Sequence, residues 1–381
     1  MAEPVLTYLS LGTNMGDKKN ALQRAVFALQ GTVGDIVRIS PVYESAAWGF
    51  ESDDFLNACV AVNTTLTPQE LLENVLRIET EMGRKRFQEE GYEPRLIDID
   101  ILYYARETVV TEKLVIPHPE LPFRKFVLRP LADIAPQFYH PILNKDTRNL
   151  IQECRDKGKL EKTTLRLFKS RQELLTHIGF IAIEGNIGAG KTTLAGKIAE
   201  DFNAKLVLER FADNPFLPKF YEDRSRYAFP LEMSFLADRY QQFSDDTSQY
   251  DLFKNFMVSD YDTYKSLIFA QVTLQAEEFR LYRKLFNLMY KEVKKPKIYV
   301  YLYQTNERLL ENIAKRGREY EQNISAEYLS KIQQGYFDFF RSYPEQNSLV
   351  IDSTDLDFVA DEADYQKVLQ QIQEFATTQL F

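Results

Sequence analysis

The stretch Phe180-Ile-Ala-Ile-Glu-Gly-Asn-Ile-Gly-Ala-Gly-Lys-Thr-Thr193 decides the fold of the second half of this chain, because a strand-like apolar run leads directly into a glycine-rich loop. The loop fits the pattern G-x-x-x-x-G-K-[ST], in which backbone N–H groups turn onto anionic oxygens, the lysine adds positive charge and the hydroxyl can ligate magnesium. The residues that follow have helical spacing, and the positive end of such a helix points at the same oxygens. The stretch therefore predicts a nucleotide phosphate site rather than an ordinary glycine turn. The residues expected to form it are Gly185, Asn186, Gly188, Gly190, Lys191 and Thr192, with Thr192 also as a magnesium ligand.

Length and composition indicate a two-domain globular protein. The chain has 381 residues, 44% of them hydrophobic and 27% charged, and no apolar run approaches membrane-spanning length. The opening residues lack the basic-then-apolar layout of a signal peptide, so we expect a cytoplasmic protein. Two cysteines are too few for a disulfide framework or a zinc cluster. The formal net charge of -9 argues against broad nucleic-acid binding and for local recognition of phosphate.

The first half of the chain alternates strand-like and helix-like segments. The expected order is strand, helix, strand, strand, helix. The segments are, in that order, 5–11, 18–29, 36–43, 55–63 and a helix that runs from Pro68 toward Met82 with Thr67 before it. This order is typical of a split βαβ sheet with helices on one face.

The densest chemistry of the first half lies between Glu79 and Asp100. Asp98 and Asp100 are two positions apart in a strand-like run, so their side chains share one face of the strand. Two carboxylates held together repel each other unless a cation lies between them, and magnesium with a polyphosphate would satisfy both. Nearby arginines would hold the remaining phosphate oxygens; they are Arg84, Arg86 and Arg95. The alternative is an edge strand whose aspartates face water and pair with these arginines.

His118 lies between two prolines, which restrict the backbone around it. A lone histidine is commonly structural, but Arg124 follows closely in the sequence, and the two side chains could contact a phosphate. The residue types alone leave both alternatives open.

Taken together, these elements resemble 6-hydroxymethyl-7,8-dihydropterin pyrophosphokinase, a folate-pathway family that moves the β,γ-diphosphate of ATP onto the pterin hydroxymethyl group. The matching motifs keep their order, at 12–14, 40–45, 55–57, 79 with 83–86, 94–100, 117–119 and 124–126. The resemblance implies that Asp98 and Asp100 bind two magnesium ions. It implies phosphate or ATP contacts from Glu79, His118, Arg124 and the catalytic arginines Arg84 and Arg95. It also implies a pterin slot built from Ser45, Gly49, Phe55, Asn57 and Phe126.

In the second half, a short strand at 204–210 ends in Glu209, beside the phosphates of a doubly wound sheet. A carboxylate there can accept the proton of an attacking hydroxyl; the alternative is an ion pair between Glu209 and Arg210. The cationic run Lys315–Arg318 predicts either a clamp over the phosphates or a solvated basic turn. Aromatic-rich segments at 220–222 and 229–239 predict a helical layer that can equally be core.

From the strand at Phe180 to the last helix, the chain resembles the deoxyribonucleoside kinase family. The matches are the phosphate loop, 220–222, 316–318 and Glu321 with 327–329. The resemblance implies that Glu209 is the catalytic base. It implies that Arg316 is a catalytic lid arginine and that Arg318, also in the lid, binds phosphate. Deoxynucleoside-binding residues implied by it are Tyr221, Glu232, Arg239 and Glu321, with Glu232 in the position of a base-recognising glutamine.

One departure from this family concerns residues 258–262, Val-Ser-Asp-Tyr-Asp, where an acidic-Arg-Ser triplet is usual. Asp260 could supply a magnesium contact there, and Lys265 or Arg239 could replace the missing arginine charge. An ionised Glu232 only accepts hydrogen bonds, which favours a base with an amino or ring N–H donor. We therefore favour a purine, deoxyadenosine or deoxyguanosine, with deoxycytidine still open.

We expect an α/β protein of two domains: a ferredoxin-like α+β domain at 1–158, a helical linker at 159–177 and a P-loop domain with a doubly wound parallel sheet at 178–381. The expected activity is that of a bifunctional transferase with ATP as co-substrate. It would use two magnesium ions in the N-terminal site and one in the C-terminal site. Its partners would be 6-hydroxymethyl-7,8-dihydropterin, a deoxynucleoside and a second copy of the chain, without nucleic acid or membrane. Two alternatives remain for the second domain: a nucleotide-sensing regulatory module, or a kinase for another small substrate.

Overall fold

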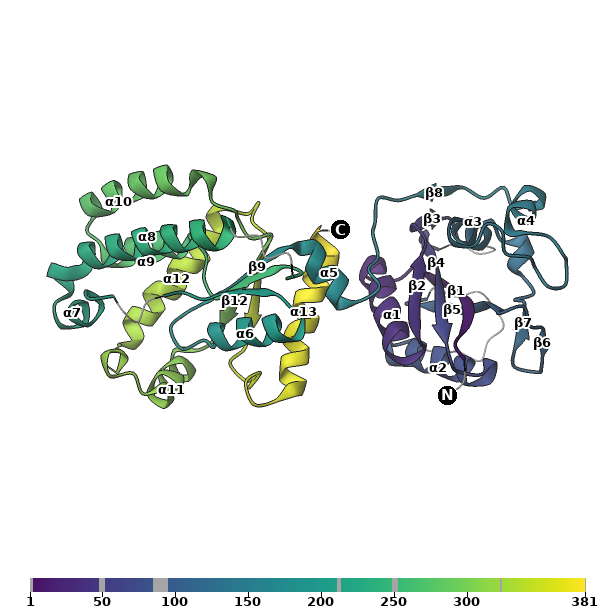
Figure 1. Cartoon of the computed structure of the whole chain (residues 1–381), viewed down its shortest axis with the longest axis horizontal. Helices are drawn as coiled ribbons and strands as arrows, with labels where there is room; N and C mark the ends of the chain where they lie inside the picture. The colour runs from purple at the N-terminus through teal and green to yellow at the C-terminus, as the bar shows by residue number, and fades with distance from the viewer. Residues whose placement is uncertain are drawn as a thin grey trace. The chain divides into compact units, whose positions relative to one another are not determined.

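The computed structural model of the chain describes residues 3–47, 52–84, 95–210, 214–248, 253–322 and 324–380 (Figure 1). The chain forms two compact units, one extending to Leu174 and the other running from Leu175 to Ala376. Each unit is built around its own β-sheet. Within the described ranges, no helix combines the length and the apolar composition needed to cross a membrane.

The first unit contains an antiparallel sheet. Its strands are β1 (Val5–Thr13), β2 (Asp35–Ile39), β3 (Tyr43–Ser45), β4 (Phe55–Thr64), β5 (Asp98–Tyr104) and β8 (Leu160–Lys162), and β6 (Val109–Val110) with β7 (Val115–Ile116) forms a separate hairpin. Its helices are α1 (Lys18–Thr32), α2 (Pro68–Glu81), α3 (Lys125–Ile134) and α4 (Thr147–Glu153), with a 3₁₀ turn η1 (Leu121–Phe123). The strand order is β5-β1-β4-β3-β8, with β2 also paired to β4. This arrangement confirms the predicted ferredoxin-like α+β class.

The two helices predicted for the first unit, α1 and α2, pack on one face of this sheet as expected, and the later helices α3 and α4 cover the other face. On one face, Leu9, Val60 and Ile99 belong to a core shared with α1 and α2. On the other face, Ala61 belongs to a core shared with Leu131 of α3 and with α4. Side chains alternate between the two faces along a strand, so Asp98, Asp100, Ser10 and Asn57 all lie on the α3 face. The face that the prediction left without helices is therefore the face that carries the site.

Helix α2 begins as the sequence predicts. The side chain of Thr67 accepts a hydrogen bond from Glu70 N at 3.3 Å, and the Glu70 carboxylate accepts one from Thr67 N at 2.8 Å, with Pro68 in the first turn. This capping box satisfies backbone donors that the helix leaves without partners. It thereby anchors the helix that carries Glu79 near its far end.

The segment 159–177 is helical only in its last part. Strand β8 pairs with β3, with Tyr43 opposite Lys162, and helix α5 (Arg171–Ile178) follows. Between β8 and α5, Gln23 Nε2 of α1 donates a hydrogen bond to Phe168 O at 2.7 Å, and Phe168 N donates one to Gln23 Oε1 at 2.8 Å. The predicted helical linker is therefore wrong over 160–168, because β3 pairs its backbone edge with this segment.

The second unit is a parallel sheet with helices around it. Its strands are β9 (Phe180–Gly185), β10 (Lys205–Val207), β11 (Met257–Ser259), β12 (Ile298–Tyr303) and β13 (Ser348–Asp352). Its helices are α6 (Lys191–Asp201), α7 (Leu217–Glu222), α8 (Arg224–Ser248), α9 (Lys265–Thr273), α10 (Ala276–Met289), α11 (Asn306–Arg316), α12 (Ala326–Ser342) and α13 (Glu362–Leu380), with 3₁₀ turns η2 (Tyr290–Glu292) and η3 (Glu319–Glu321). This confirms the predicted doubly wound P-loop architecture.

The strand order of the second sheet is β10-β11-β9-β12-β13, and all four pairings are parallel. In such a sheet the carboxyl ends of neighbouring strands meet at one edge, where ligands bind. The glycine-rich loop follows β9, Asp260 follows β11 and Glu209 follows shortly after β10. Strands β11 and β13 were not predicted from the sequence.

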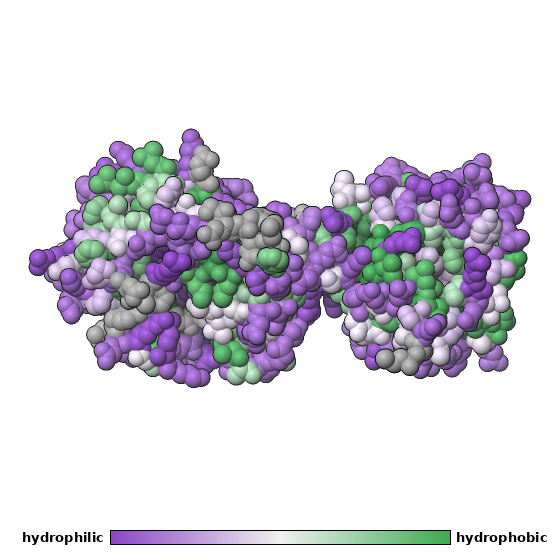
Figure 2. All heavy atoms as spheres, in the orientation of Figure 1, coloured by the Kyte–Doolittle hydropathy of each residue, from purple (hydrophilic) through white to green (hydrophobic). Residues whose placement is uncertain are grey.

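The helices of the second unit leave one apolar surface uncovered. Leu281 and Leu288 of α10 are 51% and 77% exposed. In Figure 2, hydrophobic residues gather over α10, whereas most of the visible surface is hydrophilic.

Candidate active sites

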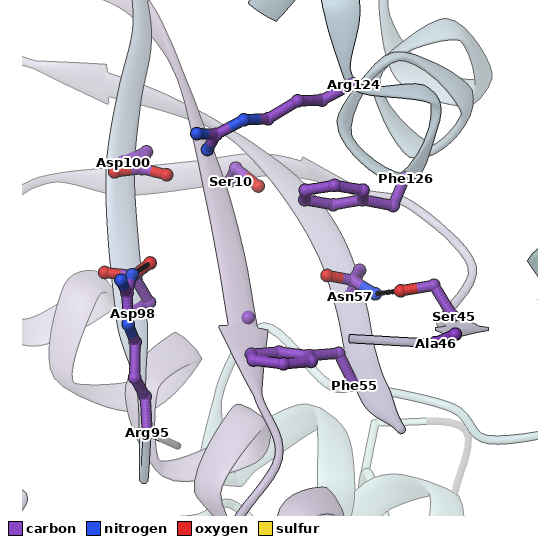
Figure 3. A pocket seen from close by; sticks show the side chains of 11 residues that line it. Ser10, Ser45, Ala46, Phe55, Asn57, Arg95, Asp98, Asp100, Arg124 and Phe126 are labelled. Carbon is purple, nitrogen blue, oxygen red and sulfur yellow. Dashed lines mark hydrogen bonds and ion pairs between the residues drawn. The ribbon is translucent and has the colours of Figure 1, made fainter. Parts of the chain in front are cut away.

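The first unit has a cavity on the α3 face of its sheet (Figure 3). The residues that line it are Ser10, Gly12, Ser45, Ala46, Phe55, Asn57, Arg95, Asp98, Asp100, Arg124 and Phe126. Strand register brings several of them together: Gly12 of β1 lies opposite Asn57 of β4 on one side and opposite Asp98 of β5 on the other. Because Gly12 has no side chain, the middle strand leaves open the space between the amide and the carboxylate.

One end of this cavity is an aromatic slot. The rings of Phe55 and Phe126 lie on either side of Asn57, whose Nδ2 donates a hydrogen bond to Ser45 Oγ at 2.9 Å (Figure 3). Asn57 is 3% exposed, and its Oδ1 remains available to a flat polar ligand on the cavity side. Two rings and a buried amide suit a planar heterocycle that stacks and hydrogen-bonds at its edge. Gly49, which was also predicted for this slot, lies outside the described residues.

The other end holds the two carboxylates and their cations. Asp98 Oδ1 accepts a hydrogen bond from Arg84 at 2.5 Å, and its Oδ2 is bonded to Arg95. The buried Glu79 carboxylate is bonded to Arg84 and accepts a hydrogen bond from Ile99 N at 2.8 Å. Glu79 therefore holds Arg84 against β5. Arg86 falls outside the described residues.

Asp100 is the less neutralised of the two carboxylates. Burial and the charge of Asp98 raise the pKa of Asp100 to about 6, although Arg124, Arg95 and Arg84 oppose this rise. His118 Nε2 lies 3.8 Å from Asp100 Oδ1. Burial and the charge of Arg124 lower the pKa of His118, so the imidazole is neutral at neutral pH. The structure thus brings His118, Arg124 and both aspartates together, as the sequence pattern suggested.

The donor set at Asp98 and Asp100 suits magnesium with a polyphosphate. Magnesium commonly takes one or two protein carboxylates and completes its octahedron with phosphate oxygens and water. The described residues contain no group of three or more His, Cys, Asp or Glu that could hold an ion unaided. Two oxygen donors beside arginines therefore fit a metal that arrives with its phosphates. The edge-strand alternative also holds in part, because β5 is the edge strand and Asp98 does pair with arginines.

In the second unit, a cavity lies at the carboxyl edge of the parallel sheet. It is lined by Ile187, Gly188, Lys191, Thr192, Glu209, Leu217, Phe220, Tyr221, Leu231, Glu232, Phe235, Arg239, Asp260, Lys265, Phe269, Arg316, Arg318, Glu321 and Tyr328. The residues predicted for the nucleoside, the catalytic base and the lid therefore share one cavity with Gly188, Lys191 and Thr192 of the phosphate loop, whereas Gly185, Asn186 and Gly190 are not among its lining residues.

The phosphate loop has the backbone that its glycines allow. Gly190 caps α6 with φ 87° in the left-handed region, and a Cβ there would lie 2.8 Å from the Phe358 ring. Only glycine fits both the conformation and the space. Lys191 Nζ donates a hydrogen bond to the carbonyl of Asn186 at 2.8 Å. Burial and the charge of Lys265 lower the pKa of Lys191 to about 8, and an anion at this loop would oppose that shift.

Thr192 and Asp260 form a hydroxyl–carboxylate pair beside this loop. Thr192 Oγ1 donates a hydrogen bond to Asp260 Oδ2 at 2.5 Å, and Asp260 Oδ1 accepts one from Glu209 N at 2.8 Å. A hydroxyl and a carboxylate at the carboxyl ends of adjacent strands are suitable magnesium ligands next to bound phosphates. Asp260 also fixes the backbone of Glu209.

The carboxylate of Glu209 is held by two cations from separate helices. Its Oε1 accepts hydrogen bonds from Arg239 Nε and Nη2 at 2.9 and 2.6 Å, and its Oε2 accepts one from Lys265 at 2.6 Å. Burial alone would raise the pKa of Glu209, but Lys265 and Arg239 lower it to about 2. Glu209 is thus ionised at neutral pH, and its described ion-pair partners are Arg239 and Lys265 rather than Arg210.

The two lid arginines meet the carboxylate of Glu321. Arg316 is bonded to Glu321, and Arg318 Nη1 donates to its Oε1 at 3.2 Å. Helix α11 ends at Gly317 in the left-handed conformation, with φ 71°, so the chain turns and brings both arginines to one carboxylate. Arg316 and Arg318 of the cationic run therefore line the cavity, whereas Lys315 is exposed to solvent.

Some site residues were not identified from the sequence. Ser10 is opposite Asp100 in the register and lines the first cavity between the carboxylates and the aromatic slot. Phe235 and Phe269 line the second cavity from α8 and α9. Strand alternation from Asp98 could have indicated Ser10 if the pairing had been known. No local signal distinguishes Phe269 from a core residue.

The comparisons with known proteins agree with this geometry. The family model described as deoxynucleoside kinase matches residues 181–377, and the one described as 7,8-dihydro-6-hydroxymethylpterin-pyrophosphokinase (HPPK) matches residues 8–136. The chain is 37% identical over 200 residues to deoxyguanosine kinase of Bacillus subtilis, covering 51% of this chain and 96% of that protein. It is 44% identical over 148 residues to 2-amino-4-hydroxy-6-hydroxymethyldihydropteridine pyrophosphokinase of Aquifex aeolicus, covering 38% and 90%.

Among solved structures, deoxyadenosine kinase from M. mycoides with bound dATP covers 51% of this chain and 98% of its own, with 22% identity and a TM-score of 0.45.

The fold and the two cavities define a transferase made of two kinase units. The chain belongs to the HPPK family through its first unit and to the deoxynucleoside kinase family through its second. Kinases of both families use ATP as co-substrate.

Proposed function

We propose that the first unit transfers the β,γ-diphosphate of ATP to 6-hydroxymethyl-7,8-dihydropterin. The proposal is supported by a single cavity in which an aromatic slot adjoins paired carboxylates and arginines. Phe55 and Phe126 would stack on the pterin, while Asn57 and Ser45 would bind its polar edge. The hydroxymethyl oxygen would attack the β-phosphorus, and the bond from that phosphorus to the α,β-bridging oxygen would break, releasing AMP.

In this proposal, Asp98 and Asp100 hold two magnesium ions together with the ATP phosphates. The metal ions would supply charge neutralisation of the polyphosphate. Arg84, Arg95 and Arg124 would bind the oxygens of the transferred group, and Arg84 would be positioned by Glu79. His118, neutral and close to Asp100, would donate a hydrogen bond to a phosphate. The test is AMP formation from ATP and the pterin, with and without magnesium.

We infer that the second unit phosphorylates the 5′-hydroxyl of a deoxynucleoside. The supporting observation is that Glu209 lines the same cavity as Lys191 and Thr192 of the phosphate loop and a set of aromatic side chains. The 5′-oxygen would attack the γ-phosphorus, the bond to the β,γ-bridging oxygen would break, and Glu209 would take the hydroxyl proton. Tyr221 and Glu321 would bind the sugar 3′-hydroxyl, and Arg316 with Arg318 would then turn to the phosphates.

A single magnesium ion at Thr192 and Asp260 is part of this proposal. Lys265 and Arg239 would take the place of the arginine that residues 258–262 lack, because both bind Glu209 in the same cavity. A positive charge on Lys265 next to Lys191 would also favour the phosphates of ATP.

A purine deoxynucleoside is the proposed substrate. The B. subtilis relative is named for deoxyguanosine, and Glu232 offers a hydrogen-bonding carboxyl to the base. The experiment is a panel of the four natural deoxynucleosides with the intact protein, measuring ADP formation. Turnover of thymidine alone would contradict the purine preference. Binding of a nucleotide without turnover of any deoxynucleoside would favour a regulatory module, which the altered segment 258–262 makes the second candidate.

We also propose that the chain forms a homodimer through α10. Leu281 and Leu288 lie one above the other at helical spacing and are exposed, and such a stripe is typical of helix–helix association. Light scattering after size exclusion would measure the mass. The variant L281D/L288D should give the monomer mass if α10 is the interface, and an unchanged dimer would contradict it.

A further inference from the structure

The carboxyl group of Glu232 is buried in the nucleoside cavity with one oxygen unpaired. Its residue is 3% exposed, and Oε1 accepts a hydrogen bond from Thr273 Oγ1 at 2.9 Å. Oε2 has no hydrogen-bond partner among the described residues. A buried acceptor without a partner is costly, so a ligand that pairs with it gains binding energy.

The described cations near Glu232 do not pair with its carboxylate. The neighbouring cations are Arg239 of α8 and Lys265 of α9, and both are bonded to Glu209, with Arg239 also donating to Ser266 at 2.8 Å. Other titratable groups that face Glu232 or its neighbours are the phenols of Tyr221 (α7), Tyr282 (α10) and Tyr328 (α12). Arg239 and Lys265 both hydrogen-bond to Glu209, so neither forms a hydrogen bond with Glu232 in the part of the chain that the structure describes.

This imbalance disfavours the ionised form of Glu232. Burial raises the pKa of Glu232 to about 7; the charge of Glu209 adds to the rise, while Arg239, Thr273 and Lys265 oppose it. The carboxyl is neutral below that pH and ionised above it. Both forms are thus populated close to neutrality.

The two forms offer a base different hydrogen-bonding groups. A neutral carboxyl has one donor and one acceptor, as a glutamine amide has, whereas an ionised one has two acceptors. Adenine presents a donor, its 6-amino group, next to a ring-nitrogen acceptor. Guanine presents two neighbouring donors, its ring N1–H and 2-amino group.

We propose that the Glu232 carboxyl selects the purine, accepting deoxyadenosine in its neutral form and deoxyguanosine in its ionised form. The proposal rests on the proposed deoxynucleoside kinase function and specifies its substrate. A glutamine at position 232 would favour deoxyadenosine at every pH, because its amide offers one donor and one acceptor as the neutral carboxyl does.

The experiment measures kcat/KM of the intact protein for deoxyadenosine and for deoxyguanosine between pH 6 and pH 8.5. The ratio of the two values removes the titration of the shared chemical step, including that of Glu209 and Lys191. We expect the ratio of kcat/KM for deoxyadenosine to kcat/KM for deoxyguanosine to fall at least tenfold as the pH rises through the titration of Glu232. A ratio independent of pH would overturn the proposal.

Two variants separate this role from a structural one. E232Q should give a deoxyadenosine-to-deoxyguanosine ratio of kcat/KM that no longer depends on pH, because an amide does not titrate. D238N, which removes an exposed carboxylate from the same helix, should keep the parental pH dependence. An E232Q ratio that still varies with pH would overturn the inference, whereas turnover of neither nucleoside by the parent protein would count against the proposed kinase function itself.

Discussion

In the first unit, the groups proposed to bind the phosphates are side chains on an antiparallel edge strand, Asp98 and Asp100, with arginines from separate segments around them. In the second unit, the loop from Gly185 to Gly190 offers its main chain at the end of a central parallel strand, and the side chains of Lys191, Thr192, Arg316 and Arg318 line the same cavity. The first site depends on strand register, because a slip of one residue would turn both carboxylates to the opposite face. The second depends on backbone conformation, which its glycines provide.

In both sites a carboxylate forms ion pairs with two cationic side chains. Asp98 is paired with Arg84 and Arg95, and Glu209 is paired with Arg239 and Lys265. In each case two cations contact one carboxylate, although Arg84 in the first unit is also paired with Glu79. An anionic substrate that enters either cavity must compete with the carboxylate for these cations.

The largest expected effect separates the two sites. D98A should lower diphosphate transfer by ~10³-fold or more, because it removes a metal-binding carboxylate, and should leave deoxynucleoside phosphorylation unchanged. K191A should lower deoxynucleoside phosphorylation to a similar extent and leave diphosphate transfer unchanged. AMP and ADP formation, measured in the same preparations, report the two reactions. Loss of both activities in either variant would contradict the independence of the sites.

The next effect concerns proton transfer in the second unit. E209Q keeps the shape of the side chain but cannot accept a proton, so kcat for the deoxynucleoside should fall by ~10³-fold. Diphosphate transfer by the first unit serves as the internal control. A variant that retains more than a tenth of the parental kcat would show that Glu209 is not the base.

A smaller effect is expected at Lys265, one of the two cations proposed to replace the arginine that residues 258–262 lack. K265M should lower kcat for the deoxynucleoside by ~10²-fold, because Glu209 loses a partner and the phosphates lose a nearby charge. K265R should restore most of the activity, since it keeps that charge. Equal losses in both variants would point to packing rather than charge at this position.

The aromatic slot of the first unit should show a binding effect. N57A removes the buried amide, and we expect KM for the pterin to rise by ~5-fold with little change in kcat, because about 1 kcal/mol of hydrogen bonding is lost. Initial rates at varied pterin concentration test this. An unchanged KM would remove Asn57 from the pterin site.

The smallest effect concerns the stability of helix caps in the two units. T67A removes the capping box of α2 and should lower the free energy of unfolding by about 1 kcal/mol. The matched change T305A removes the cap of α11 in the second unit, where Thr305 accepts a hydrogen bond from Arg308 N at 3.4 Å. Thermal denaturation should show a shift for T67A without loss of deoxynucleoside phosphorylation, and T305A should also impair that reaction because α11 carries Arg316.

Residue patterns determined the fold class of both halves and the location of the phosphate loop. The spacing of Asp98 and Asp100, the glycines before Lys191 and the strand before Glu209 are local features, and local conformation is set by residues close in the chain. The same reasoning failed where pairing over long distances decides, as in β8, which joins β3 although more than a hundred residues separate them.

What only the tertiary structure decided is which charges meet. No sequence spacing connects Glu209 with Lys265 and Arg239, or places Ser10 beside Asp100, because these contacts arise when helices and strands from distant segments pack together. The protonation of Glu232 belongs to the same class, since it depends on burial and on how neighbouring cations are shared. The sequence alone therefore determined two phosphate-handling units, and the tertiary structure decided the charge balance inside each of them, because electrostatic energies depend on distance and burial rather than on order along the chain.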